Sequence, residues 1–147
     1  MKSCVFFGHA KYDYVPYKER IKDSIIELIE KYDVEQFYSG GRGAFDGICA
    51  RTVAALKTRY PHIKNTLFLS YIPKVGEGQS LPEYFDDSVY LLESYVPPRY
   101  AIIRSNECAI LKADFVLSGV RYSWGGAAKA VEFAQRKGKG IFSVIWY

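Results

Sequence analysis

A glycine-rich turn at residues 39–46 is the feature that most constrains how this chain can fold. The segment before it, 35–39, is short and aromatic, which predicts a strand, and residues 48–60 have helical spacing that stops at Pro61. A strand, a glycine-rich turn and a helix in this order place bare backbone N–H groups at the positive end of a helix. We therefore expect this turn to hold a phosphate or another anion.

Short apolar segments alternate with amphipathic segments along the rest of the chain. Strands are predicted at residues 2–7, 35–39, 66–70, 88–92, 114–118 and 141–146, and helices at 16–32, 48–60, 99–112 and 125–137. Residues 73–82 are expected to form a loop, and no repeat or linker divides the chain. Such alternation is typical of βαβ units with right-handed crossovers. It predicts an α/β fold with a mainly parallel sheet, formed by a single domain over residues 1–147.

Composition argues against several classes of function. The net charge of +4 is spread along the chain, which gives little support for a nucleic-acid partner. Cys4, Cys49 and Cys108 are widely spaced and have no histidine at metal-ligand spacing, so we expect buried reduced thiols, no metal site and no cofactor. The sequence has no run of about 18 apolar residues, so we expect no membrane span and a cytoplasmic location.

Tyrosine is unusually common in the chain, with 13 residues. A tyrosine ring can pack while its hydroxyl stays hydrogen-bonded, so this enrichment suits a ligand rim or an interface, for example in a homodimer. Ordinary packing in the core and at the surface is the alternative that we expect for most of these residues.

Three glycine-containing turns follow predicted strands, at residues 8–9, 39–41 and 119–126. Ligands of parallel α/β sheets bind outside the carboxyl ends of the strands, so we expect these turns to meet around one pocket. The residues of the turns that are expected to contact a ligand are Gly8, His9, Ser39, Gly40, Gly41, Arg42, Gly43, Asp46, Gly125 and Gly126.

Three side chains in these turns have more than one interpretation. Arg42 is well suited to a phosphate, because a guanidinium offers several donors in one plane. Asp46 is expected in the first turn of a helix, where it either caps free N–H groups or accepts a hydrogen bond from a ribose hydroxyl. His9 is either a base or donor for the ligand, or a structural histidine.

Together these motifs resemble the SLOG superfamily, and within it the small YpsA-like proteins. The resemblance rests on Phe7-Gly8-His9, the turn 39–46, residues 60–64 and Gly125-Gly126, and it covers essentially the whole chain. The superfamily includes the Rossmann-like domain of the DNA-processing protein A group and the Lonely Guy phosphoribohydrolases. The resemblance implies a Rossmann-like three-layer sandwich that binds a nucleotide or a nucleotide-derived ligand. It also implies a pocket role for Asn106, which fits an Arg-Asn pair of the family.

The sequence departs from the family pattern at several positions. Ala10 stands where the small proteins usually have an arginine, and Ser105 takes the arginine place before Asn106, with Arg104 one residue earlier. Against the Lonely Guy pattern P-G-G-x-G-T-x-x-E, residues 124–132 keep two glycines and Glu132 but lack the third glycine and the threonine. The resemblance implies catalytic roles for Glu132 and Arg104 in cleaving an N-glycosidic bond, and the alternative for Glu132 is a solvent-facing helix residue.

Three functions remain open at this point. The first is binding or sensing of a nucleotide or nucleotide-derived ligand in a pocket at the carboxyl ends of the strands. The second is a nucleotide N-glycosidase, a phosphoribohydrolase of nucleoside monophosphates, that uses Glu132. The third is single-stranded DNA binding, which requires a basic groove with stacking aromatic side chains and has little support from the charge. We favour the first, because the glycine turns are kept while the catalytic pattern is altered.

Overall fold

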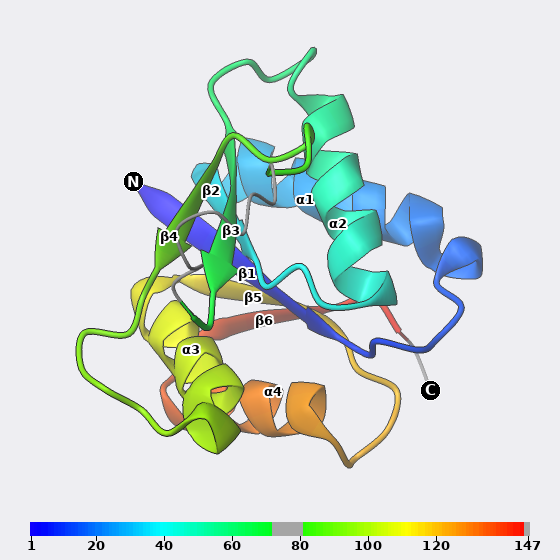
Figure 1. Ribbon diagram of the computed structural model, residues 1–147. Helices are drawn as coiled ribbons and strands as arrows, with labels where there is room; N and C mark the ends of the chain where they lie inside the picture. The colour runs from blue at the N-terminus through cyan, green and yellow to red at the C-terminus, as the bar shows by residue number, and fades with distance from the viewer. Residues whose placement is uncertain (72–80, 146–147) are drawn as a thin grey trace.

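Six strands form one all-parallel sheet in the computed structural model, which describes residues 1–71 and 81–145 (Figure 1). The order across the sheet is β4-β3-β2-β1-β5-β6. The strands are β1 (Lys2–Gly8), β2 (Val34–Ser39), β3 (Lys64–Leu69), β4 (Asp87–Tyr90), β5 (Phe115–Gly119) and β6 (Gly140–Ser143). The α/β fold predicted from the sequence is therefore confirmed, and the sheet is parallel throughout rather than mainly so.

Helices cover both faces of the sheet and complete the three layers. They are η1 (Val15–Tyr17), α1 (Lys18–Tyr32), α2 (Ala44–Leu56), α3 (Pro98–Lys112) and α4 (Gly126–Arg136). Figure 1 shows α1 and α2 on one side of the strands and α3 and α4 on the other. The central strand β1 is buried on both faces because its side chains alternate: Cys4 and Phe6 join one core cluster, and Val5 and Phe7 join the other.

Several helices and strands begin or end at residues other than those expected from the sequence. Helix α2 begins at Ala44 instead of 48, since Gly43 caps it with a φ of 101°, and it ends at Leu56 instead of 60. Pro16 lies in the 3₁₀ turn η1 and not in the first turn of α1. Strand β4 ends at Tyr90, and β6 ends at Ser143 instead of 146. The loop expected at 73–82 lies outside the described residues except for its last two positions.

The strand order places a topological switch point between β1 and β5. From β1 the chain adds β2, β3 and β4 in one direction, and β5 and β6 then pair on the other side of β1. The carboxyl ends of the two strands lie side by side, with Gly8 paired in register to Gly119. A crevice outside this point is where ligands bind in open α/β sheets.

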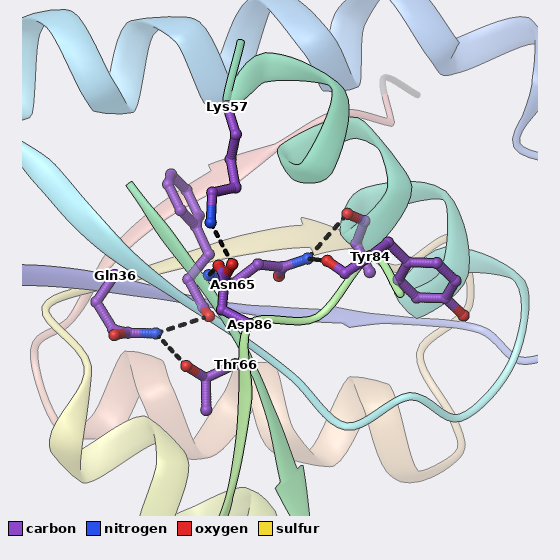
Figure 2. Close-up of polar contacts among 8 residues, drawn as sticks. Gln36, Lys57, Asn65, Thr66, Tyr84 and Asp86 are labelled. Atoms are coloured by element: carbon purple, nitrogen blue, oxygen red, sulfur yellow. Dashed lines mark hydrogen bonds and ion pairs between the residues drawn. The ribbon is translucent and has the colours of Figure 1, made fainter. Parts of the chain in front are cut away.

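A buried amide anchors the opposite end of the sheet (Figure 2). Asn65 is fully buried, and its Nδ2 donates hydrogen bonds to the carbonyls of Ala50 (3.0 Å) and Tyr84 (2.7 Å). Its backbone N–H donates to Oδ2 of Asp86 at 2.8 Å, and Asp86 also pairs with Lys57. Asn65 therefore ties the start of β3 to α2 and to the segment that leads into β4.

We expect Asn65→Ala to lower the free energy of unfolding by about 2–4 kcal/mol, because the carbonyls of Ala50 and Tyr84 lose their donor. Urea unfolding followed by circular dichroism measures this change. Lys57→Met is the control: it removes only a partly exposed ion pair with Asp86, which is worth about 1 kcal/mol or less. Equal losses in the two variants would contradict the anchoring role of Asn65.

Candidate ligand-binding site

A cavity of about 230 Å³ lies at the switch point. Its walls come from the end of β1, the turn after β2, β3, the middle of α3 and the start of α4. Of the residues expected at a ligand site, the structure brings six to this cavity: Gly8, His9, Arg42, Asp46, Asn106 and Gly126.

Arg42 supplies the positive charge of this cavity. Its guanidinium donates hydrogen bonds to Oγ of Ser70 (3.0 Å) and Oδ1 of Asn106 (2.8 Å) and lies 5.6 Å from the ring centre of Phe68. Both acceptors are neutral, so they orient the guanidinium without cancelling its charge. Two N–H donors of the guanidinium are held by these bonds, and its remaining N–H groups lie at a cavity wall. Such an arrangement is suited to binding an anion.

Asp46 is a buried carboxylate in the same wall. Its Oδ2 accepts a hydrogen bond from the backbone N–H of Arg42 at 2.9 Å, so the side chain does satisfy an N–H group ahead of the helix. Burial raises the pKa of Asp46 to about 6, although this hydrogen bond and the charge of Arg42 act in the opposite direction. The cavity thus has an acceptor for a ligand hydroxyl or N–H beside its cation.

The backbone N–H groups of the glycine turn are largely used within the chain, contrary to the expectation of bare donors there. The N–H of Gly41 donates to Oγ of Ser39 at 3.2 Å. At the start of α2, the N–H groups of Ala44 and Phe45 donate to the carbonyls of Ala10 (2.9 Å) and His9 (3.4 Å). The loop after β1 therefore occupies the place where an anion was expected, and Arg42 contributes its side chain instead.

Helix α4 offers the open N-terminus that α2 lacks. Gly126 and Ala127 line the cavity, and no acceptor among the described residues takes their backbone N–H groups. A Cβ added at Gly126 would meet no atom within 4 Å, so packing does not demand a glycine at this position. Because the first N–H groups of a helix carry a partial positive charge, this end of α4 complements Arg42.

His9 holds the loop that leads into α4. Its Nε2 accepts hydrogen bonds from the backbone N–H groups of Arg121 (2.8 Å) and Tyr122 (3.2 Å). Burial lowers the pKa of His9 below its ordinary value, and an accepting Nε2 requires the proton on Nδ1. His9 therefore has the structural role that was one of its two interpretations, and Nδ1 is the ring nitrogen that remains for a ligand.

Several of the expected glycines serve packing. A Cβ at Gly8 would lie 2.3 Å from Phe45, and one at Gly41 would lie 2.6 Å from Leu67. Gly40 is covered by Arg42 and Phe68, and the Cβ of any other residue at position 43 would meet Ala10. Ser39, Gly40, Gly41, Gly43 and Gly125 are not among the residues that line the cavity, and their predicted contacts with a ligand remain predictions.

Glu132 and Arg104 lie in separate depressions. Glu132 is exposed in a groove of about 350 Å³ between α3 and α4, which shares Asn106 and Gly126 with the cavity. Arg104 lines another hollow, beside the segment after β4, and pairs with Glu107 at 3.4 Å. Arg104 itself therefore does not line the Glu132 groove, although its partner Glu107 does, and the catalytic roles of both residues remain predictions.

Sequence reasoning did not expect five of the residues that line the cavity, nor Ser70, which accepts a hydrogen bond from Arg42; the five are Phe7, Ala10, Phe68, Ile102 and Ala127. Phe68 lies near the end of β3 and Ser70 directly follows it; both were expected only as strand residues, and both contact the Arg42 side chain. Ile102 lies on α3 and is about half exposed, at 49%. The signal that could have found Phe68 and Ser70 is their place at the carboxyl end of a central strand.

The sequence also led to expectations about the cysteines, a metal site and membrane spans. Cys4 and Cys49 are buried, but Cys108 is only partly so, because it faces the hollow beside α3 that Arg104 also lines. Among residues 1–71 and 81–145, no group of three or more His, Cys, Asp or Glu side chains is placed to hold a metal ion. Within the same residues, every helix is too short or too polar to span a bilayer.

Neither protein-family models nor curated protein sequences match the chain, whereas several solved structures match its fold. DNA processing protein A from Streptococcus pneumoniae has a TM-score of 0.67 and 14% identity over 97% of this chain and 50% of that chain. The same protein from Helicobacter pylori, described for its single-stranded DNA binding, has a TM-score of 0.63, 16% identity and coverages of 97% and 64%. The molybdenum cofactor carrier protein from Chlamydomonas reinhardtii has a TM-score of 0.56, 14% identity and coverages of 97% and 75%.

These likenesses establish the Rossmann-like fold that the sequence resemblance implied. The chain spans about half the length of the Streptococcus pneumoniae protein that it matches. At such low identities only the fold is shared, and the resemblance to the SLOG superfamily, and within it to YpsA-like proteins, remains a prediction.

We expect Asp46→Asn to raise the free energy of unfolding at pH 7 by about 1–3 kcal/mol and to have little effect at pH 4. The folded chain holds a proton on Asp46 up to a pKa of about 6, whereas an unfolded aspartate releases it near a pKa of about 3.9. The stability contribution of Asp46 therefore falls as the pH rises from about 4 to 6, and asparagine avoids this loss while keeping an oxygen for the Arg42 N–H.

Urea unfolding at several pH values between 4 and 7.5 measures this effect. Asp23→Asn, on the exposed face of α1, is the control for removing one carboxylate from the surface. A stability difference between Asp46→Asn and the wild type that does not depend on pH would contradict the raised pKa.

Proposed function

We propose that this chain binds a nucleotide or nucleotide-derived ligand in the switch-point cavity. The observation that carries the proposal is the pairing, in one cavity, of the Arg42 guanidinium with the open N-terminus of α4. A phosphate is the group that suits both, because it accepts from backbone N–H groups at a helix start and from guanidinium donors at the same time. The Rossmann-like fold and the position outside the carboxyl ends of β1 and β5 agree with this assignment.

The neutral and acidic groups of the cavity suit the remainder of such a ligand. Asp46 has a carboxylate at the wall that can accept from a sugar hydroxyl, and the Asn106 amide can donate beyond the bond that it accepts from Arg42. Ile102 and Phe68 add apolar surface. A cation, an acceptor and an apolar wall within one small cavity match a phosphorylated sugar better than a metal ion or a purely apolar compound.

Arg42→Gln should weaken binding of a nucleoside monophosphate about 10- to 100-fold, because a charge-assisted contact worth about 1.5–3 kcal/mol is lost. Isothermal titration of AMP, GMP, CMP and UMP into the pure protein measures this. Arg59→Gln is the control. It removes one positive charge at the opposite end of the sheet, where Arg59 pairs with Glu30, and it should bind the nucleotides as tightly as the wild type does.

A second variant separates the helix start from the arginine. In Gly126→Val the added Cβ meets no atom within 4 Å, so we expect the fold to be kept while the branched side chain reduces access to the N–H groups of α4. Weaker binding in Arg42→Gln and in Gly126→Val, with unfolding curves like that of the wild type, supports the proposed cavity. Failure of the wild type to bind any of the four nucleotides would overturn the proposed function.

The hydrolase alternative rests on Glu132, whose groove adjoins the cavity through Asn106 and Gly126. We favour binding over hydrolysis, because Glu132 is exposed and Arg104 lines another hollow. Incubation with nucleoside monophosphates, followed by chromatography for the released base, should show no turnover. Base release that disappears in Glu132→Ala would establish the hydrolase instead.

A further inference from the structure

Three aromatic rings lead from the cavity wall to the solvent. His9 lines the cavity, and its ring centre lies 5.0 Å from that of Tyr122. Tyr122 in turn stacks on Trp124, with ring centres 4.7 Å apart and an angle of 19° between the planes. Exposure rises along this series, to 39% for Tyr122 and 67% for Trp124.

The exposed indole of Trp124 has no role in the core of the protein. It stacks on one ring, Tyr122, and leaves most of its surface in water, which is unfavourable for so large an apolar group. The loop just before it is nevertheless held in place, since Nε2 of His9 accepts hydrogen bonds from the backbone N–H groups of Arg121 and Tyr122. A rigid, exposed aromatic ring is a surface on which a planar ligand can stack with little loss of conformational entropy.

The surroundings of Trp124 connect it to the cavity. Trp124 precedes Gly125 and Gly126, and a Cβ added at either glycine would meet no atom within 4 Å. The cavity volume of about 230 Å³ is below the roughly 300–1,000 Å³ of typical small-molecule pockets. A nucleotide whose phosphate lies at the start of α4 would therefore extend past the cavity, and the loop 120–125 that leads into α4 is bonded to His9 of the cavity wall.

We propose that Trp124, backed by Tyr122, is a stacking wall for the base of the bound nucleotide. The inference rests on the proposed function and adds the recognition of the base to that of the phosphate. A stacking contact does not read hydrogen-bonding groups, so this wall accepts purine and pyrimidine bases alike. The ligand class is thus a mononucleotide or a dinucleotide-like compound with a base held at the surface.

The competing occupant of this aromatic surface is a second copy of the chain, since aromatic side chains are also enriched at protein interfaces. The open space beside Gly125 and Gly126 and the link through His9 to the cavity favour the nucleotide. The oligomeric state of the variants therefore forms part of the test.

The experiment compares the four nucleoside monophosphates with ribose 5-phosphate, which has the same phosphate and sugar but no base. Wild type should bind at least one nucleotide about 5- to 100-fold more tightly than ribose 5-phosphate. Trp124→Ala should remove this advantage and leave the affinity for ribose 5-phosphate unchanged, while Trp124→Phe should keep part of it. In a Trp146→Phe background, Trp124 is the only one of the chain's two tryptophans that remains, so quenching of its fluorescence by the nucleotide reports the stack directly.

Each outcome separates this inference from the proposed function. Nucleotide binding that exceeds ribose 5-phosphate binding but survives Trp124→Ala overturns the stacking wall and leaves the proposed function standing. Equal binding of nucleotides and ribose 5-phosphate by the wild type also overturns the stacking wall and leaves the proposed function standing. If neither binds, both proposals fall. A wild-type dimer that dissociates in Trp124→Ala with unchanged nucleotide affinity, measured by analytical ultracentrifugation, assigns Trp124 to an interface between copies.

Discussion

The packing of one ring, that of Phe45, determines how the candidate site is assembled. Phe45 is fully buried against the strand ends, and any Cβ at Gly8 or Gly119 would lie 2.3 or 2.4 Å from it. Tyr14 closes the other side, with ring centres 4.8 Å apart, and its hydroxyl accepts from the N–H of His9 and donates to the carbonyl of Gly119. The start of α2 is thereby fixed against the carboxyl ends of β1 and β5, and Arg42 and Asp46 are carried to the cavity wall.

This packing also decides which helix start can meet an anion. The loop after β1 is drawn so close to α2 that its carbonyls accept the first N–H groups of that helix. Helix α4 has no such neighbour at Gly126, so its first N–H groups stay accessible from the cavity. Helices α2 and α4 have similar glycine-rich beginnings but different roles. The first N–H groups of α2 are hydrogen-bonded within the fold and the Arg42 guanidinium before it faces the cavity, whereas α4 presents its own backbone N–H groups.

The cavity keeps a carboxylate whose ionised form is disfavoured by burial, and this is a cost in stability at neutral pH. Groups with shifted pKa values are common at functional sites of proteins, and they also occur in structural networks. Beside Arg42 and the start of α4, the carboxylate of Asp46 gives the cavity both donors and an acceptor, as a sugar phosphate requires. The aromatic loop after β5 continues this surface outward from His9 to Trp124.

The sequence by itself determined the architecture of this protein. The alternation of apolar and amphipathic segments specified the α/β fold, and the glycine turns marked the edge of the sheet where the cavity lies. These features are local, because periodicity and turn chemistry act over a few residues. Boundaries such as the start of α2 at Ala44 were missed, since they depend on contacts with the distant loop after β1.

The hydrogen-bond partners of each polar group were decided only by the tertiary structure. The sequence predicts Arg42 as an anion contact, but the side chains that hold its guanidinium, Ser70 and Asn106, lie 28 and 64 positions away in the chain. The sequence likewise could not tell that the N–H groups of the turn 39–46 are used internally while those of α4 are open. Motif spacing shows which groups are present, whereas only the packing of distant segments decides which of them are already satisfied and which remain for a ligand.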